Sequence, residues 1–557
     1  MKKTVFVLFI SFVFVFVVFA QNVSNTALVS REKNPFKKYL RPSVSILLLE
    51  RSDNNWERMH KVVEQSKIPD KYNNNNVKIS SVKGNISDLS NTLSREVSRE
   101  IVAKWFNRNE KGEFNMDVIA ERGLYNATDG DVLKAKASQR KTDLLRDAGE
   151  YLLDRSYILV YDIKDIKNIS ETKNSAGVFG EKEGYECKYD CYLFRLDWND
   201  SVAAIFYNKF WVDASSPDQQ KAKAFENIRF PVKFVGKTTD AFGSVESSQY
   251  KDHKLNAVTL TDDVLFAGLF EVIKENSGVS LAQICEDFKV KTPIAYTHPI
   301  AAKIGLKEGL SVDKRYFAYE LEIDDKGQRK AVRKGVVRAG RYISDNRHLA
   351  TGKSDSSVFY QIYGKKLYEG MQLQENPDWG MGVMLGWGGL PGIGQGLNGT
   401  IELNASMWSG KAIRGMRPGI KLYLNGHALG ENLTVKMPAN GKDSTYSILG
   451  AAVGISKDLN FLHYFVLTPF VGYGMEFLKN VDQTDSKGQY DTGFFQVGSR
   501  FGISIKDNVQ LMANFSYNST GSAQPDKVGG GTQPVADLIK SARGSNTQFY
   551  VGIRIQY

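Results

Sequence analysis

The side chains that most often perform catalysis or bind metal ions do not cluster in this sequence. The six histidines are scattered, and none forms an i, i+4 pair or an HExxH motif, so no zinc site is predicted. There is no GxSxG motif and no P-loop. The glycine-rich stretch "GWGGLPGIGQG" at 386–396 lacks the strand-to-helix context of a phosphate cradle. We therefore expect a protein that is not an enzyme, with no catalytic residue, no metal and no cofactor.

Two further groups have simple structural explanations. "WNDS" at 198–201 places a carboxylate beside a hydroxyl, and a β-turn accounts for it. Cys187 and Cys191 lie in a segment typical of a strand, where they would be about 13 Å apart, too far for a disulfide unless a turn separates them. Cys285 is expected to be a small buried hydrophobic residue.

One cluster of like charge stands out, a basic stripe. Its simplest interpretation is the solvated face of a sheet. A functional hypothesis is contact with anionic cell-wall or inner-leaflet groups. The basic stripe consists of Arg329, Lys330, Arg333, Lys334, Arg338 and Arg341.

Five other charged residues share a different property, because each falls on the polar side of an alternating segment. The pattern is clearest in the final segment, "NTQFYVGIRIQY" at 546–557. Successive side chains of a strand point to opposite faces, so this segment has one apolar face and one polar or small face. The same alternation returns seven more times from residue 379 onward. The charged residues on the polar side are Glu402, Lys421, Glu476, Arg500 and Arg554.

The lengths of these eight segments and of their connections predict a transmembrane barrel. Each segment is near the 9–11 residues that a tilted strand needs to cross a bilayer. The connections 456–462 and 505–508 are short, whereas 429–444, 478–490 and 518–545 are longer. Short turns on one side and long loops on the other are typical of an outer-membrane barrel with its short turns in the periplasm. The connection 409–417, as long as the one at 389–397, departs from this contrast.

A soluble barrel or sandwich also alternates, so it is the alternative. The apolar faces carry almost no charge, and aromatic residues lie toward the strand ends, as in a membrane girdle. These two observations, together with the expected export of the chain, favour the membrane interpretation. Pro469 counts against a regular strand, because it removes one hydrogen bond of the ladder. The aromatic residues are Trp379, Trp387, Tyr473, Tyr517 and Tyr557.

Residues 373–557 resemble the small OmpA/OmpX-like eight-stranded outer-membrane proteins in architecture and in the last strand, "FYVGIRIQY". In that class a terminal strand ending in an aromatic residue is read by the barrel-assembly machinery. The resemblance implies that the outer-membrane bilayer and this machinery are partners. It also implies a C-terminal insertion signal of Phe549, Val551, Ile553, Ile555 and Tyr557.

Eight strands enclose a space that side chains can fill. We predict that Glu402 and Glu476 pair inside it with Lys421, Arg500 and Arg554, with His427 nearby, because unpaired charges in a confined site are costly. A plug of paired charges is one interpretation, and a narrow conducting pore is the other. A solute-passing porin would need about twice as many strands.

The start of the chain predicts export. Lys2 and Lys3 precede an apolar run at 5–20, which is typical of a signal peptide, with an uncleaved membrane anchor as the alternative. Later residues contain no other apolar run near 18 residues. The net charge of +11 is spread without a basic tail, so nucleic acid is not an expected partner.

Between these ends we expect a linker at 21–41, a mixed α/β domain at 42–290 and a small β-rich domain at 291–372. Within the α/β domain, 43–50, 156–163 and 201–213 are expected strands, the last in a hairpin with 184–197. Residues 86–106, 130–154 and 262–275 show helical spacing. This order resembles the periplasmic α/β domain of the curli-secretion and LpoB-type families.

The small domain resembles the β-module of FlgT-like proteins. "KIGLKEGLSVDKRYFAYELE" at 303–322 follows the pattern "lGxxdGvxxGdxfxV", with Asp313-Lys314 where that pattern has Gly-Asp. The resemblance implies a binding or assembly module without catalytic residues.

The predicted fold class is α+β: a periplasmic α/β domain and a small β-domain, followed by an eight-stranded antiparallel barrel in the outer membrane of a Gram-negative cell envelope. The expected function is to anchor a large periplasmic domain that binds a periplasmic protein or peptidoglycan. The alternatives are a periplasmic hydrolase tethered to a barrel, or a narrow channel or surface adhesin that uses loop 518–545.

Overall fold

The computed structural model describes most of the chain after residue 34. The expected signal peptide, most of the expected linker, most of the helix expected at 130–154 and most of loop 518–545 lie outside the described residues. The chain divides into two compact units. The described residues are 35–36, 39, 41–52, 55–126, 149–171, 176–177, 180–248, 261–323, 329–347, 355–390, 394–408, 418–430, 432–436, 443–481, 489–520 and 546–557.

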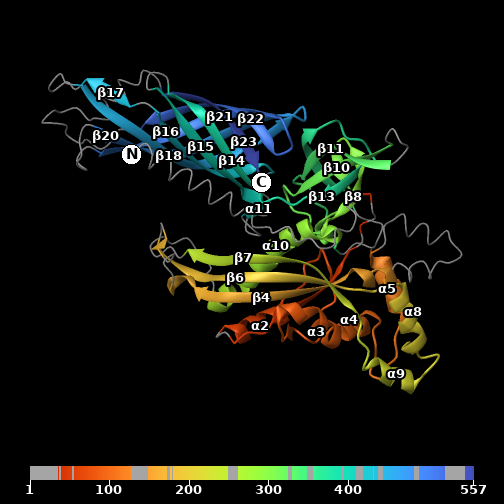
Figure 1. The fold of residues 1–557 in the computed structure, drawn as a ribbon. Helices are drawn as coiled ribbons and strands as arrows, with labels where there is room; N and C mark the ends of the chain where they lie inside the picture. The colour runs from red at the N-terminus through yellow and green to blue at the C-terminus, as the bar shows by residue number, and fades with distance from the viewer. Residues whose placement is uncertain are drawn as a thin grey trace. The chain divides into compact units, whose positions relative to one another are not determined.

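The first unit, which runs to Val290 and includes Leu306–Gly309 and Asp345–Ser354, is built on a seven-stranded sheet (Figure 1). Strand β1 (Ser43–Leu49) pairs in parallel with β2 (Asn73–Asn74), β3 (Ser81–Val82) and β4 (Ser156–Asn168). The antiparallel part follows, with β6 (Gly180–Leu196) between β4 and β7 (Val232–Ser248), and β5 (Ala176–Gly177) at the start of β6.

Helices cover both faces of this sheet. On one face, α2 (Trp56–Gln65) and α10 (Asp262–Ile284) pack on the even-numbered residues of β1. On the other face, hydrophobic side chains of the remaining helices pack on Leu47 and Leu49. These are α3 (Leu89–Glu96), α4 (Ser98–Trp105), α5 (Met116–Asn126), α8 (Asp200–Lys209) and α9 (Gln219–Phe225). No helix in the described part of the chain is both long and apolar enough to cross a membrane.

The strands expected at 43–50 and 156–163 and the helical segments at 86–106 and 262–275 are confirmed, but the strand expected at 201–213 is wrong. Residues Asp200–Lys209 form helix α8 instead. The side chain of Asn199 accepts hydrogen bonds from the backbone N–H groups of Ser201 and Val202, each at 3.1 Å. "WNDS" is therefore a helix N-cap rather than a β-turn. Cys187, Cys191 and Cys285 are all free and buried.

The second unit begins with a small closed barrel, which we call the small β-domain. Its strands pair in the order β10-β11-β12-β9-β8-β13. The turn before β10 contains Asp313, whose φ of +67° lies in the left-handed region that glycine favours. The strands are β8 (Lys291–Thr297), β9 (Ile300–Ala302), β10 (Arg315–Ile323), β11 (Arg329–Ala339), β12 (Ser357–Gly364) and β13 (Gln372–Glu375).

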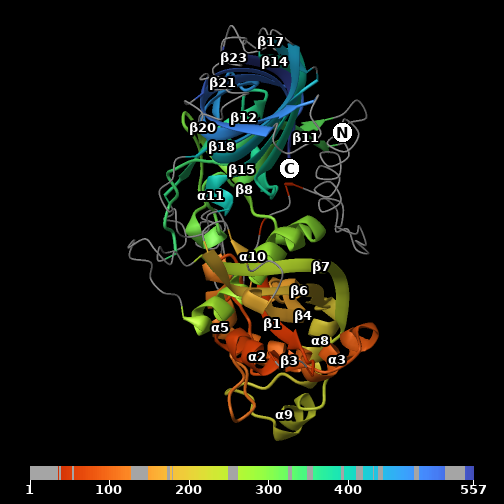
Figure 2. The ribbon, with the colours of Figure 1, turned by 90° about the vertical axis from the view of Figure 1, so that its left-hand side faces the viewer.

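The same unit ends with an eight-stranded antiparallel barrel, seen nearly end-on in Figure 2. The first and last strands pair along their length, from Gly382 with Gln556 to Gly389 with Phe549, and so close the ring. The strands are β14 (Met381–Leu390), β15 (Gly394–Asn404), β16 (Ile420–Leu429), β18 (Asp443–Lys457), β20 (Phe465–Asn480), β21 (Gln489–Ser504), β22 (Val509–Thr520) and β23 (Thr547–Gln556), with short β17 (Leu433–Lys436) and β19 (Leu459–Phe461) at the rims.

The barrel has its apolar side chains outside and its charged side chains inside. Trp387, Val453 and Tyr473 are each more than half exposed, whereas Glu402 and Arg500 are 1% exposed. A water-soluble barrel would show the opposite pattern. Together with closure by eight antiparallel strands, this distribution identifies a barrel of the outer-membrane type.

Strand β15 ends earlier than the alternation predicts. In the sequence the alternation of apolar and polar residues continues to Met407, but Asn404 is the last residue of β15 and the short helix α11 (Ala405–Trp408) follows. The side chain of Asn404 accepts the backbone N–H of Ser406 at 3.0 Å, which turns the chain at this point.

Candidate functional site: the charged end of the barrel lumen

One end of the barrel carries both ends of the barrel chain, and we call it the terminal end. There the backbone N–H of Tyr557 donates to the carbonyl of Met381 at 2.8 Å, and that of Trp379 donates to the carbonyl of Tyr557 at 3.1 Å. The turns containing Asp458 and Asp507 lie at the same end, because consecutive strands run antiparallel and every second connection returns the chain to the end where the barrel begins.

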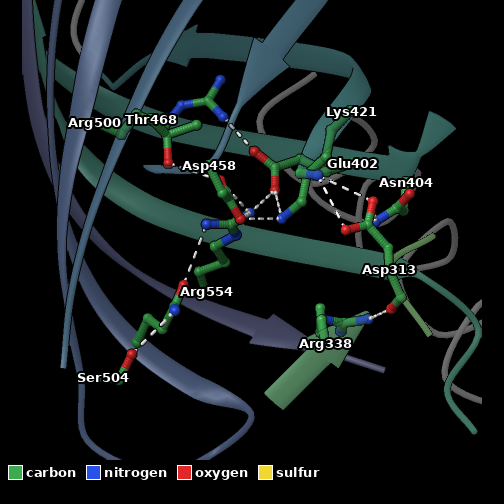
Figure 3. A network of polar contacts seen from close by, with 12 residues as sticks. Asp313, Arg338, Glu402, Asn404, Lys421, Asp458, Thr468, Arg500, Ser504 and Arg554 are labelled. Carbon is green, nitrogen blue, oxygen red and sulfur yellow. Dashed lines mark hydrogen bonds and ion pairs between the residues drawn. The ribbon is translucent and has the colours of Figure 1, made fainter. Parts of the chain in front are cut away.

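Glu402 is the centre of the charges inside this end (Figure 3). One carboxylate oxygen of Glu402 accepts from Arg500, and the other lies against Arg554 and 3.4 Å from Nζ of Lys421. The guanidinium group of Arg500 also lies over the ring of Phe470, 4.5 Å from its centroid. Glu402 therefore compensates three cations within the lumen.

Asp458 is a second carboxylate in the same network. Its side chain is 9% exposed, 2.6 Å from Nζ of Lys421 and 2.9 Å from Nη2 of Arg554. The hydroxyl of Thr468 donates to it at 2.8 Å. Asp458 follows directly after β18 and keeps its alternation. Ser456 lies opposite Phe470 and Leu459 opposite Leu467, so the register on β20 does not shift, and Asp458 faces the lumen as Ser456 does. Three basic and two acidic side chains therefore form one network, with one positive charge in excess.

A carboxylate from the small β-domain joins the barrel at this end. Asp313 is fully buried and accepts the backbone N–H of Gly419 with both oxygens, at 3.1 and 3.0 Å. It also accepts from Nδ2 of Asn404 at 3.1 Å and from the hydroxyl of Ser406. The turn that the FlgT-like pattern gives to glycine is thus occupied by an aspartate that binds the barrel mouth.

Arg338 supports this contact from the small β-domain. Its guanidinium group donates to the backbone carbonyl of Asp313 at 2.7 Å and pairs with Asp378. Tyr360 donates its hydroxyl to the Asp313 carboxylate. Burial raises the pKa of Tyr360 well above its ordinary value, and the charge of Asp313 raises it further, so the hydroxyl stays protonated and able to donate.

The space left between these groups is small. A cavity of about 30 Å³ lies among Arg338, Tyr360, Asn404, Lys421 and Asp458, which is room for about one water molecule. Further along the lumen, a cluster of Met384, Val466, Met512 and Tyr550 is buried. At the terminal end of the barrel, the cavity is therefore no larger than a water molecule needs.

The five charged residues chosen from sequence do not all lie together. Glu402, Lys421, Arg500 and Arg554 form one network. Glu476 lies elsewhere in the lumen, fully buried, with its Oε1 3.3 Å from Nε2 of His427. Sequence reasoning missed Asp458, which lies in a turn outside the alternating segments, and Asp313, which belongs to another domain.

The basic stripe is not a single exposed surface. Arg338 is buried against Asp378, and Arg333 pairs with Asp507 at 3.1 Å on the rim of the barrel. Lys334 pairs with Glu320 and Glu322. The pairing of β10 and β11 shifts register at Ala318/Tyr319, and that of β11 and β12 shifts at Val336/Val337. The basic side chains of the stripe therefore do not all point to the same face of the sheet. Arg329, Lys330 and Arg341 remain exposed.

The residues of the expected insertion signal lie on the outer surface of β23. Phe549, Val551 and Ile553 are 51%, 42% and 51% exposed, and Tyr557 is 38% exposed. Strand β23 completes the barrel by pairing with both β14 and β22. Among the described residues, no group of three or more His, Cys, Asp or Glu side chains is placed to hold a metal ion.

Comparisons with known proteins return similar solved structures only. Solved structures that are similar include the N-terminal β-barrel domain of Pseudomonas aeruginosa OprF, with 9% identity, 32% of this chain and 100% of that chain covered, and a TM-score of 0.20. Neisserial surface protein A gives 11% identity, 33% and 100% coverage and a TM-score of 0.21. Ail of Yersinia pestis gives 10% identity, 32% and 97% coverage and a TM-score of 0.18. No family model matches the chain, and no curated protein matches it.

Proposed function

We propose that this protein is an outer-membrane anchor whose barrel holds a large periplasmic domain in place to bind another component of the cell envelope. The observation that carries the proposal is the buried contact of Asp313 with the mouth of a packed barrel. A barrel that conducts solutes keeps its mouth open, whereas this mouth is occupied by the neighbouring domain.

The periplasmic side is inferred from topology. An even number of strands brings both ends of the barrel chain to one end, where the turns after β19 and β21 are short. Short turns face the periplasm in outer-membrane barrels, so the small β-domain and the N-terminal unit belong on that side. The expected signal peptide supports the same location. On this proposal, the assembly machinery recognises β23, and neither unit performs catalysis.

The location is tested by adding protease to intact cells and to cells with a permeabilised outer membrane. The proposal predicts that the N-terminal unit survives in intact cells and is digested after permeabilisation, while the barrel survives in both. Digestion of the N-terminal unit in intact cells would place it outside the cell and contradict the proposal. Planar-bilayer recordings of the full chain should show no stable conductance, and a reproducible pore would favour the channel alternative.

The exposed basic residues of the small β-domain support a more specific partner. Arg329, Lys330 and Arg341 are free to contact an anionic polymer such as peptidoglycan. Reversing the charge at Arg329 and Lys330 should weaken retention of the full chain on isolated peptidoglycan. The matched control reverses the exposed Lys209 and Lys223 of the N-terminal unit. Equal loss in both variants, or no loss in either, would remove peptidoglycan as the partner of this surface.

A further inference from the structure

The N-terminal unit contains an open crevice where two neighbouring parallel strands end. We call it the β1–β3 crevice; its volume is about 500 Å³, within the range of small-molecule sites. It is formed by the end of β1 and the residues after it, the loop after β3 and a short stretch of β4. The lining residues are Leu49, Glu50, Arg51, Ser52, Gly84, Asn85, Ile86, Lys164 and Asp165.

The topology of the sheet explains why a crevice forms there. Strands β1 and β3 are parallel neighbours, with Leu48 opposite Ser81. After β1 the chain enters α2, which packs on the face of Val44 and Ile46. After β3 it enters α3, which packs on the opposite face with Leu47 and Leu49. The two connections therefore separate at the carboxyl ends of the strands, which is where open α/β sheets bind their ligands.

A β-bulge presents an acidic side chain to the crevice. The pairing of β4 with β6 shifts register between Lys164 and Lys167, and Asp165 has a φ of +52°. The left-handed region strains residues other than glycine, although Asp adopts it more readily than most, and such strain is common at functional sites. Asp165 is exposed, and its carboxylate has no ion-pair partner within the described ranges.

Two basic side chains are fixed beside it. Arg51 pairs with Asp162 through Nε and Nη2, so its Nη1 has no hydrogen-bond partner among the residues that the structure describes. Lys164 lies 2.6 Å from Asp190 and 3.1 Å from Asp162. Burial acts to raise the pKa of Asp162, but its hydrogen bonds to Arg51 and Lys164 outweigh burial and lower it. The buried Asp162 carboxylate is therefore charged at neutral pH and holds both cations in place.

We propose that the β1–β3 crevice binds a small zwitterionic ligand, an amino acid or the free end of a short peptide, whose carboxylate contacts Arg51 and whose ammonium group contacts Asp165. The side chains of Arg51, Lys164 and Glu50 are 39%, 31% and 28% exposed, so both signs of charge are accessible within one cleft. Two cations and two carboxylates line it, which suits a ligand without net charge better than a phosphate or a metal cation. The proposal does not depend on the role of the barrel.

The test is isothermal titration calorimetry of the detergent-solubilised full chain with alanyl-alanine as the probe. We expect saturable binding at millimolar or lower concentration, weakened about two- to fivefold when either the ammonium or the carboxylate of the probe is blocked, because an ion pair that water can reach contributes only modestly. No saturable binding of the unblocked dipeptide would overturn the proposal. Equal binding of the blocked and unblocked probes would overturn it as well.

Two variants of one residue separate binding from folding. Asp165→Asn keeps a side chain that tolerates the left-handed region but removes the charge, so it should bind alanyl-alanine about two- to fivefold more weakly. In this variant, blocking the ammonium group of the probe should make no further difference. Asp165→Gly should abolish the same contact while raising thermal stability slightly, because glycine adopts a φ of +52° without strain. Unchanged affinity in both variants would contradict the role of Asp165.

Discussion

The carboxylate of Asp313 accepts the backbone N–H of Gly419 through both of its oxygens, at 3.1 and 3.0 Å, and so joins the small β-domain to the mouth of the barrel. These residues are 106 positions apart and belong to different β-barrels. The contact turns two folded barrels into one compact unit, and it is the basis of the first prediction.

Replacing Asp313 by alanine should destabilise the unit more than replacing it by glycine. Both changes leave the buried donors of Gly419 and Asn404 without their acceptor, at about 1–3 kcal/mol for each donor. Alanine is in addition strained by the backbone φ of +67° at this position, whereas glycine adopts this conformation freely. Urea unfolding in detergent micelles measures the difference. An Asp313→Gly protein as stable as the unchanged one would mean that the carboxylate contributes no more than the backbone strain that glycine relieves.

Glu402→Gln should be the most destabilising single change in the lumen. It leaves Lys421, Arg500 and Arg554 with Asp458 as their remaining carboxylate, and breaking a buried ion pair costs about 3–5 kcal/mol. The matched control is Thr468→Val, which removes one hydrogen bond to Asp458 and should cost about 1 kcal/mol. If the two variants unfold at the same urea concentration, the network does not stabilise the barrel as proposed.

A lysine at Val453 distinguishes a bilayer from water outside the barrel. Val453 belongs to β18 and is 59% exposed. It lies opposite Leu424, which is in the middle of β16. Facing lipid near the midplane, Val453→Lys should cost about 2–4 kcal/mol, whereas Leu462→Lys in a rim turn should cost about 0–1 kcal/mol. Equilibrium unfolding in lipid vesicles gives both values. A harmless Val453→Lys would show that this surface faces water.

Tyr557 should matter for assembly through its aromatic ring. Tyr557→Ala should reduce the heat-modifiable, compact form of the barrel on cold gels of membrane fractions, because the insertion signal loses its last residue. Tyr557→Phe keeps the ring and should assemble normally. Normal assembly of both variants would limit the role of Tyr557 to its backbone bonds with Trp379 and Met381.

The barrel could be predicted from sequence because its information is local. Eight segments alternate between apolar and polar residues, and this alternation defines the strands, their two faces and the number of strands in the barrel. Helix α8 shows the limit of such reading, since "SVAAIFYNKF" has the composition of a strand and only the N-cap at Asn199 indicates a helix.

The site was predictable in part, for a physical reason. Glu402, Arg500 and Arg554 could be chosen by parity, because each lies within a regular strand. Asp458 keeps the parity of β18, because the register on β20 does not shift there, but it lies in the connection 456–462, which was not counted among the alternating segments. Asp313 comes from a separate barrel, and its burial depends on docking that no local pattern encodes. The charge at position 313, in a turn where the related pattern has glycine, was the available signal.

Cross-linking of residues 333 and 507 in native outer membranes tests most directly whether the small β-domain is fixed to the barrel. Cysteines would replace Arg333 and Asp507, which pair at 3.1 Å, and a short bifunctional thiol reagent would be added to cells. The pair Lys334 and Glu322, within one hairpin, is the positive control, and Arg333 with Asp443, on the opposite rim, is the negative control. A docked domain predicts an intramolecular link for 333–507 as complete as that of the positive control. A cross-linking yield for 333–507 no higher than that for 333–443 would contradict the docking of the small β-domain on the barrel mouth.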